Sequence, residues 1–287
     1  MTLTTIRSSK ARRRAAVVAC VLALTLLIVV QASAHDTWLI APTNVGRVGT
    51  PFRLDLTSGE TFANDDFAIE PGRVARAQVR AGHFIRSLPV PSGTPLTLRY
   101  MWTPKFPGVA TIGIELRPKV LTLAPKLIEE YLGEINADSD IRATWKSLGD
   151  KQKWTESYTK HAMTFARIMP ARPDSNWTAE KSWMKPIGLG LELVPERDPT
   201  NLRGGDTLVV RVLSHGAPLA GFSVGAIREG RSAATFFRTD AAGRASVLLD
   251  RGGRWLLNGT QLRRSKTGAS VWESDFVTAT LHVAPRP

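Results

Sequence analysis

Short runs of alternating apolar and polar residues dominate the chain from residue 35 to residue 118. The clearest runs are 51–57 and 96–102, a further apolar segment covers 109–116, and clusters of proline and glycine separate them. Successive side chains of a strand point to opposite faces of a sheet, so alternation is typical of strands with one buried face. The pattern predicts a sandwich of antiparallel strands in this part of the chain.

The spacing of apolar residues changes between residues 120 and 169. A helix is expected over 124–135, where apolar residues recur every three or four positions: Leu127, Ile128, Tyr131, Leu132 and Ile135. A second helix is expected from Ser139 to Gly149. A third is expected over 151–169, with one stripe formed by Trp154, Tyr158, His161, Ala162 and Phe165. We therefore predict a helical insertion at about 120–169, in or after the first sandwich.

Strand-like runs return from Leu189 to the end of the chain, at a spacing of about ten residues. Turn motifs lie between them, and in one of these Asp240 is expected to bond its own turn while Gly243 takes positive φ. The predicted fold class is mainly β, with two β-sandwich modules. The N-terminal sandwich with its helical insertion would cover 35–186, and an immunoglobulin-like sandwich would cover 187–287.

Residues 1–34 have the order of a signal peptide. Five basic residues and no acid lie within the first fourteen positions, and a charge-free apolar run follows from Ala15 to Val30. The segment ends in a small-x-small pattern at Ala32 and Ala34. We predict cleavage after Ala34 and export to the periplasm or the exterior. The alternative is an anchor formed by residues 15–34, although a run of about 16 residues is shorter than a membrane span.

Cleavage at this point would change the composition of the protein. Cys20 is the only cysteine, so the mature chain would contain no disulfide, thiolate nucleophile or cysteine metal site. The formal net charge is +13, and the leader carries five of these charges, which leaves +8. The remaining basic residues are scattered, without the stripe or aromatic platform of a nucleic-acid-binding protein. No nucleic-acid partner is expected, and membrane contact is expected only through the signal segment.

His35 is the residue with the most informative chemistry. Cleavage after Ala34 would give it a free α-amine beside its imidazole, and both nitrogens can be neutral near neutral pH. Such a residue could chelate Cu(II) or Ni(II) through two nitrogens. His161 is the first candidate for a distant second ligand, and Asp36 is expected to act only from behind His35. The other interpretation is that cleavage merely falls before a polar residue.

Several short motifs together resemble the DUF4198 family: residues 34–42, Tyr158 with Lys160, 191–195, 198–199, 205–206, 216–221, 239–244, 253–256 and 272–274. The resemblance covers nearly all of residues 35–287. It implies a periplasmic protein similar to the substrate-specific parts of nickel and cobalt uptake systems, with a membrane metal transporter as partner. The family pattern also implies a histidine where this chain has residues 258–261, and a tyrosine in place of His161.

Three functions remain open on the sequence alone. The first is a metal-binding accessory of transition-metal uptake, with nickel, cobalt or copper bound by His35 and His161. The second is a metal-free adhesion or scaffold module, since fold type alone does not define function. The third is a copper-dependent oxidative enzyme, which also uses an N-terminal histidine. The sequence lacks the usual motifs of zinc proteases, serine hydrolases and nucleotide-binding enzymes, which favours a protein without catalytic residues.

Overall fold

The computed structural model describes residues 35–149, 153–172, 181–266 and 271–286. These residues belong to one compact unit. The predicted signal peptide, residues 1–34, lies outside the described residues. Within the described part of the chain, no helix is long and apolar enough to cross a membrane.

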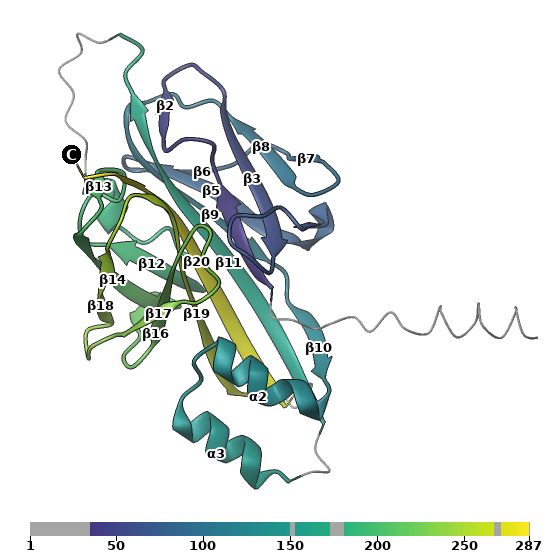
Figure 1. The fold of residues 1–287 in the computed structure, drawn as a ribbon. Helices are drawn as coiled ribbons and strands as arrows, with labels where there is room; N and C mark the ends of the chain where they lie inside the picture. Colours follow the sequence, from purple (N-terminus) through teal and green to yellow (C-terminus); the bar gives the residue numbers. More distant parts are fainter. Residues whose placement is uncertain (1–34, 150–152, 173–180, 267–270, 287) are drawn as a thin grey trace, which may run out of the picture. The chain divides into compact units, whose positions relative to one another are not determined.

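A sheet of eleven described strands forms the centre of the molecule (Figure 1). Its main path, in spatial order, is β17 (Thr235–Arg238), β16 (Ser223–Arg228), β19 (Gly253–Arg264), β20 (Trp272–Ala284), β11 (Trp154–Met169), β9 (Gly108–Leu116), β5 (Val74–Ala81) and β6 (Phe84–Ser87). Three short strands pair outside this path: β2 (Val45–Arg47), β10 (Lys119–Leu123) and β13 (Leu202–Arg203). The two longest strands, β11 and β20, run parallel to each other.

Two smaller sheets and two α-helices complete the described fold. One sheet contains, in order, β1 (Asp36–Ile40), β3 (Phe52–Gly59), β8 (Leu98–Trp102) and β7 (Ser92–Gly93), with β4 (Phe67–Ala68) paired to β3. The other contains β12 (Leu191–Pro195), β14 (Asp206–Ser214), β15 (Ala217–Pro218) and β18 (Arg244–Leu249). The helices are α2 (Pro125–Glu134) and α3 (Ser139–Ser147), and short 3-10 turns cover Pro71–Arg73 and Lys181–Met184. The prediction of a mainly β fold is therefore confirmed.

The two largest hydrophobic clusters among the described residues both include residues of strand β11. Ala162, Ala166 and Ile168 pack with residues of β1, β3, β8 and β9. Met163 and Phe165, on the other face of β11, pack with residues of β12, β14, β18 and β20. Because the large sheet continues across residues 186 and 187 in space, the two halves share one sheet. The predicted division into two separate sandwich modules stays a prediction.

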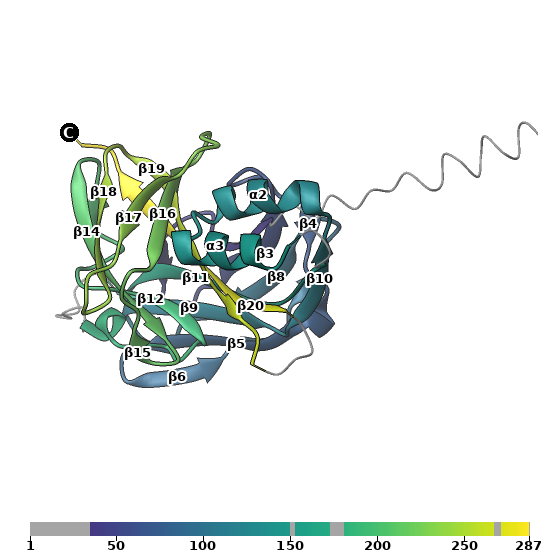
Figure 2. The ribbon, with the colours of Figure 1, turned by 90° about the horizontal axis from the view of Figure 1, so that it is seen from below.

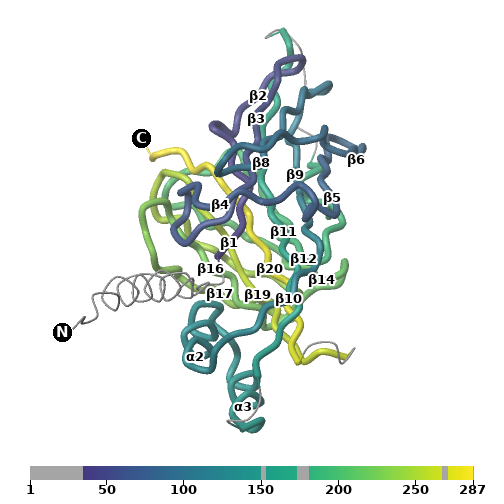
Figure 3. Tube along the Cα trace, turned by 90° about the vertical axis from the view of Figure 1, so that its right-hand side faces the viewer, coloured from purple at the N-terminus to yellow at the C-terminus, as the bar shows by residue number. Residues whose placement is uncertain are grey.

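The third predicted helix is wrong, because residues Trp154–Met169 form strand β11. The strand is covered on both faces and lies between β20 and β9, so it lacks the clean alternation of a half-exposed strand. Several of its residues are β-branched or aromatic, as strands favour. The helical part of the insertion is thus limited to α2 and α3, which lie together at one end of the large sheet (Figures 1 and 3).

The predicted turn at residues 239–244 has the expected chemistry. Oδ1 of Asp240 accepts hydrogen bonds from the backbone N–H groups of Ala242 and Arg244, at 2.8 and 2.9 Å. Gly243 has a φ of 74°, which residues with a Cβ rarely adopt. This turn leads into β18 and is determined by local sequence.

Candidate functional site

The residue that would begin the mature chain lies on the surface of the large sheet. His35 immediately precedes β1, which is the edge strand of its own small sheet. Side chains of the large sheet donate hydrogen bonds to the backbone carbonyl groups of His35 and of β1. Lys160 Nζ donates to the carbonyl oxygen of His35, and Thr278 Oγ1 donates to that of Thr37 at 2.6 Å. Carbonyls at a strand edge need such partners when they are covered, so these bonds hold His35 and the start of β1 against the large sheet.

The imidazole of His35 is held by one aromatic contact and has one free ring nitrogen. Its ring stacks on that of Phe67, with centroids 5.0 Å apart. Nε2 lies 3.8 Å from Oε1 of Glu60, whereas Nδ1 is buried and has no hydrogen-bond partner. Burial lowers the pKa of His35 below its ordinary value of 6.5, and the carboxylate of Glu60 opposes this shift. The neutral ring, which is the form that binds metals, therefore persists to lower pH.

Three polar side chains from three strands meet behind His35. Asn258 Nδ2 on β19 donates to Oδ2 of Asp36 at 2.7 Å. Burial raises the pKa of Asp36, and the bond from Asn258 opposes the shift. Burial also lowers the pKa of Lys160 to about 8, although the charge of Asp36 acts in the opposite direction. The ammonium of Lys160 lies 5.6 Å from the ring centroid of Tyr158 and 5.8 Å from that of Phe276, a cation–π arrangement.

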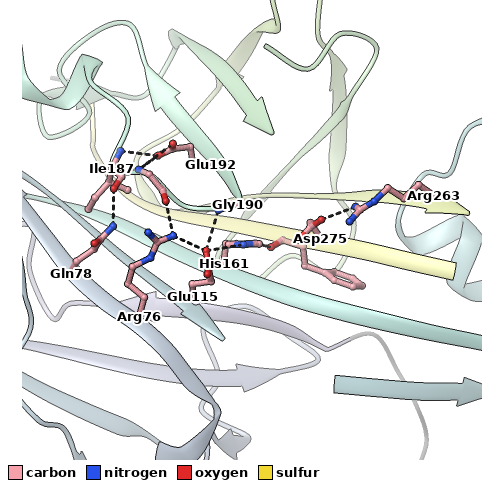
Figure 4. A network of polar contacts seen from close by, with 11 residues as sticks. Arg76, Gln78, Glu115, His161, Ile187, Gly190, Glu192, Arg263 and Asp275 are labelled. Carbon is pink, nitrogen blue, oxygen red and sulfur yellow. Dashed lines mark hydrogen bonds and ion pairs between the residues drawn. The ribbon is translucent and has the colours of Figure 1, made fainter. Parts of the chain in front are cut away.

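His161 lies on the opposite face of β11 from Lys160, and the structure does not bring its ring to His35. Its side chain is 1% exposed. Nδ1 lies 3.0 Å from the carbonyl oxygen of Phe276, and Nε2 lies 3.4 Å from Oε2 of Glu115 (Figure 4). Neighbouring residues of a strand point to opposite faces, which explains why Lys160 is near His35 and His161 is not. Both ring nitrogens of His161 have partners, so its arrangement is that of a structural residue.

Glu115 connects several elements beside His161 (Figure 4). Its Oε2 accepts hydrogen bonds from Arg76 Nη2 at 2.9 Å and from the backbone N–H of Gly190 at 3.1 Å. The hydrogen bond with His161 lowers the pKa of Glu115 to about 2, with further contributions from Gly190 and Arg76. Gly190 follows the predicted domain boundary, so this carboxylate links the two halves of the chain.

We expect the Glu115→Gln variant to lose stability at neutral pH but not in strong acid. The pKa of Glu115 is about 2 in the folded protein against an ordinary 4.5, so between these values the unfolded chain binds more protons. The stabilisation is therefore complete above about pH 4.5 and is lost as pH falls toward 2, and it amounts to about 2–3 kcal/mol. Chemical denaturation of both proteins at pH 7, 4.5 and 2.5 measures the difference. A difference that stays constant across this range would contradict the assignment, and Glu129→Gln, on an exposed side chain, is the control.

The donors near His35 suit an open chelate rather than a closed protein cage. Among the described residues, no group of three or more histidine, cysteine, aspartate and glutamate side chains could hold a metal ion. A metal at this position would therefore need at least one donor atom that does not belong to such a side chain. The buried, unpartnered Nδ1 of His35 fits this requirement, because the α-amine of a cleaved chain would belong to the same residue. The α-amine and Nδ1 together could hold a soft or borderline cation such as Cu(II) or Ni(II).

The comparison with protein families gives a match to a family described as a domain of unknown function, DUF4198, over residues 32–261. The chain belongs to the DUF4198 family. A search of curated protein sequences gives no match. The suspected resemblance is thus confirmed, while the function that it implies stays a prediction.

Solved structures resemble this DUF4198 protein only distantly. The D0-D1 domain of Intimin is 10% identical, with a TM-score of 0.20, and the match covers 86% of this chain and 97% of that one. The adhesin InvE of Yersinia pseudotuberculosis is 12% identical, with a TM-score of 0.22 and coverages of 86% and 59%. Alpha-2-macroglobulin of Escherichia coli is 11% identical, with a TM-score of 0.24 and coverages of 88% and 20%. Structural similarity this weak does not indicate a function for this chain.

The position where the family pattern implies a histidine lies at this same site. The stretch 258–261 is part of β19, and Asn258 contacts Asp36 directly. Sequence reasoning noticed the missing histidine and the motif residue Lys160, but it could not place either beside His35. Glu60 and Phe67 were missed altogether, because they are ordinary surface residues of a loop and a short strand. The pairing of β1 with β3 brings Glu60 beside His35, and the pairing of β4 with β3 brings Phe67 there.

Proposed function

We propose that this DUF4198 protein is an exported, metal-binding accessory of transition-metal uptake, with His35 as its principal metal ligand. It is cleaved after Ala34, works in the periplasm or outside the cell, and delivers nickel, cobalt or copper to a membrane transporter. Its role is binding rather than catalysis. The leader-like order of residues 1–34 supports export.

The observation that carries the proposal is the state of the His35 ring. Its Nδ1 is buried without a hydrogen-bond partner, which is costly for a polar atom unless something else satisfies it. After cleavage, the α-amine of the same residue joins it as a second nitrogen donor. The lowered pKa of the imidazole reduces competition by protons. The remaining positions stay open, as a protein that must release its metal to a partner requires.

Other residues of the site position this chelate. Lys160 holds the carbonyl oxygen of His35, and Phe67 holds its ring. Asn258 donates a hydrogen bond to Oδ2 of Asp36, and in this proposal the carboxylate of Asp36 lies behind the metal and is not a ligand. His161, predicted as the second ligand, is committed to Glu115 and Phe276. Its place in the proposal is therefore to support β11 and not to bind the metal.

The test is a calorimetric titration of Cu(II) and Ni(II) into the exported protein, whose N-terminus is first verified by sequencing. We expect His35→Ala to weaken binding by at least about 100-fold. One alanine inserted ahead of His35 should have a similar effect, because it displaces the α-amine while it leaves the imidazole in place. His161→Ala should change the affinity by less than about threefold.

The control is His83→Ala, which removes a histidine from the exposed turn between β5 and β6. The proposal fails if the extended protein binds either metal as tightly as the mature one, because the α-amine would then not be a ligand. A protein that binds neither metal would leave a metal-free binding module as the preferred function.

A further inference from the structure

An apolar groove opens beside β6, which ends the main path of the large sheet and is distant along that path from β19 and β20. Its volume is about 310 Å³. The residues that line it come from β5, β6, the segment just after β6, the end of β8 and the loop that follows β8. Figure 2 shows β6 at the margin of the sheet, outside β5. The groove therefore lies at the open edge between the two facing sheets of the N-terminal half.

Large apolar side chains line this groove and face solvent. Phe84 on β6 is 55% exposed, Phe106 on the loop is 53% exposed, and Met101 on β8 is 46% exposed. The two phenylalanine rings are stacked, with centroids 6.3 Å apart. Beneath them lies Val79, which belongs to the hydrophobic core. Grouped exposed aromatic residues of this kind mark binding surfaces more often than isolated ones do.

The charge around the groove has one sign. Arg86 and Lys105 line it, and no aspartate or glutamate does. Arg86 lies 5.7 Å from the ring centroid of Phe84, and neither cation forms an ion pair with another described residue. These two positive charges are therefore available to a carboxylate of a bound molecule. They also disfavour a second copy of this chain, which would place like charges opposite each other.

Strand β6 offers backbone hydrogen bonds on its outer side. Among the described strands it pairs only with β5, through residues Phe84–Ser87, and all four residues are exposed. An edge strand presents unpaired N–H and C=O groups to any extended chain that reaches it. Main-chain bonds along such an edge give affinity, and pockets for alternate side chains give specificity.

We propose that this groove and the β6 edge together bind an extended segment of a partner protein that carries an apolar anchor flanked by acidic residues. The segment adds a strand to β6. Its anchor enters the space between Phe84, Phe106 and Met101, and its carboxylates meet Arg86 and Lys105. The site does not depend on metal binding at His35, so each proposal can fail without the other.

The test uses the exported protein and two synthetic heptapeptides as probes. One peptide carries glutamate, phenylalanine and glutamate at positions 2, 4 and 6 with threonine at the other positions, so that all three side chains share one face of the added strand, and the other peptide carries lysine in place of both glutamates. Calorimetry at low ionic strength should show that the acidic peptide binds at least tenfold more tightly than the basic one. Phe106→Ala should weaken this binding at least tenfold, because it removes a wall of the groove at a half-exposed position. The double variant Arg86→Glu/Lys105→Glu should reverse the preference.

The control is Leu248→Ala, which removes an equally exposed apolar side chain from β18 and should leave peptide binding unchanged. The proposal is overturned if the two peptides bind equally, if neither binds, or if Phe106→Ala binds like the parent protein. It is also overturned if Phe106→Ala abolishes a concentration-dependent dimer in light scattering, which would assign the groove to a second copy. Loss of flotation with phosphatidylglycerol vesicles in the same variant would assign it to lipid.

Discussion

Replacement of Glu156 by alanine is expected to lower the free energy of unfolding by about 3–5 kcal/mol. Glu156 is fully buried on β11. Its Oε1 accepts hydrogen bonds from the hydroxyl groups of Tyr131, at 2.8 Å, and of Ser274, and its Oε2 accepts one from Trp154 Nε1 at 2.8 Å. Burial raises the pKa of this carboxyl, and the three donors act in the opposite direction. Its removal would leave three buried donors without an acceptor.

The same residues attach the helical insertion to the large sheet. Tyr131 belongs to α2, and its ring meets the indole of Trp154 edge-on, with centroids 5.7 Å apart. The indoles of Trp154 and Trp272 stack at 4.7 Å. We therefore expect Glu156→Ala to loosen α2 first, which hydrogen exchange of residues 125–134 would report.

Denaturation with urea at pH 7 measures the loss in stability. Glu156→Gln keeps the shape and one carbonyl oxygen, but its amide must face at least one donor, so about half of the loss is expected. Glu129→Ala on the outer side of α2, where the side chain is 59% exposed, should cost less than about 1 kcal/mol. An equal effect of the Glu156 and Glu129 substitutions would show that the buried cluster does not stabilise the fold.

Gly243→Ala is expected to cost about 3–4 kcal/mol, well above the usual cost of a Cβ at positive φ. Gly243 has a φ of 74°. A Cβ at this position would lie 2.8 Å from the carbonyl oxygen of Val212 and 3.0 Å from the backbone nitrogen of Leu219. Both are backbone atoms of the neighbouring strand and turn, and they bond to each other at 3.0 Å. Neither can move without breaking that contact.

Gly230 gives a matched control for this prediction. Its φ is 77°, and a Cβ there would meet nothing within 4 Å. Gly230→Ala should therefore show only the conformational cost, about 1–2 kcal/mol. Thermal and urea denaturation of the two variants separate the steric contribution from the dihedral one. If both variants lose the same stability, the close approach of the backbone at Gly243 does not matter.

Local sequence was sufficient for the features that depend on short-range physics. The spacing of Ile128, Tyr131 and Leu132 predicts α2 because residues three and four apart share a helix face. Asp240 and Gly243 predict their turn because one side chain bonds to adjacent backbone and one residue lacks a Cβ. Alternation predicts a mainly β fold. The motifs also identified the family over most of the chain.

The tertiary structure alone decided the conformation of residues 154–169 and the surroundings of His35. Strand β11 forms because β20, more than one hundred positions later in the chain, pairs with it from Glu156 to Thr164. That pairing turns Lys160 toward His35 and His161 toward Glu115. The pattern of apolar residues along the chain indicates the periodicity of each segment, but it does not indicate which strand pairs with that segment in the sheet. Because strand partners and strand faces are set by long-range pairing, the sequence could propose His35 but not its neighbours.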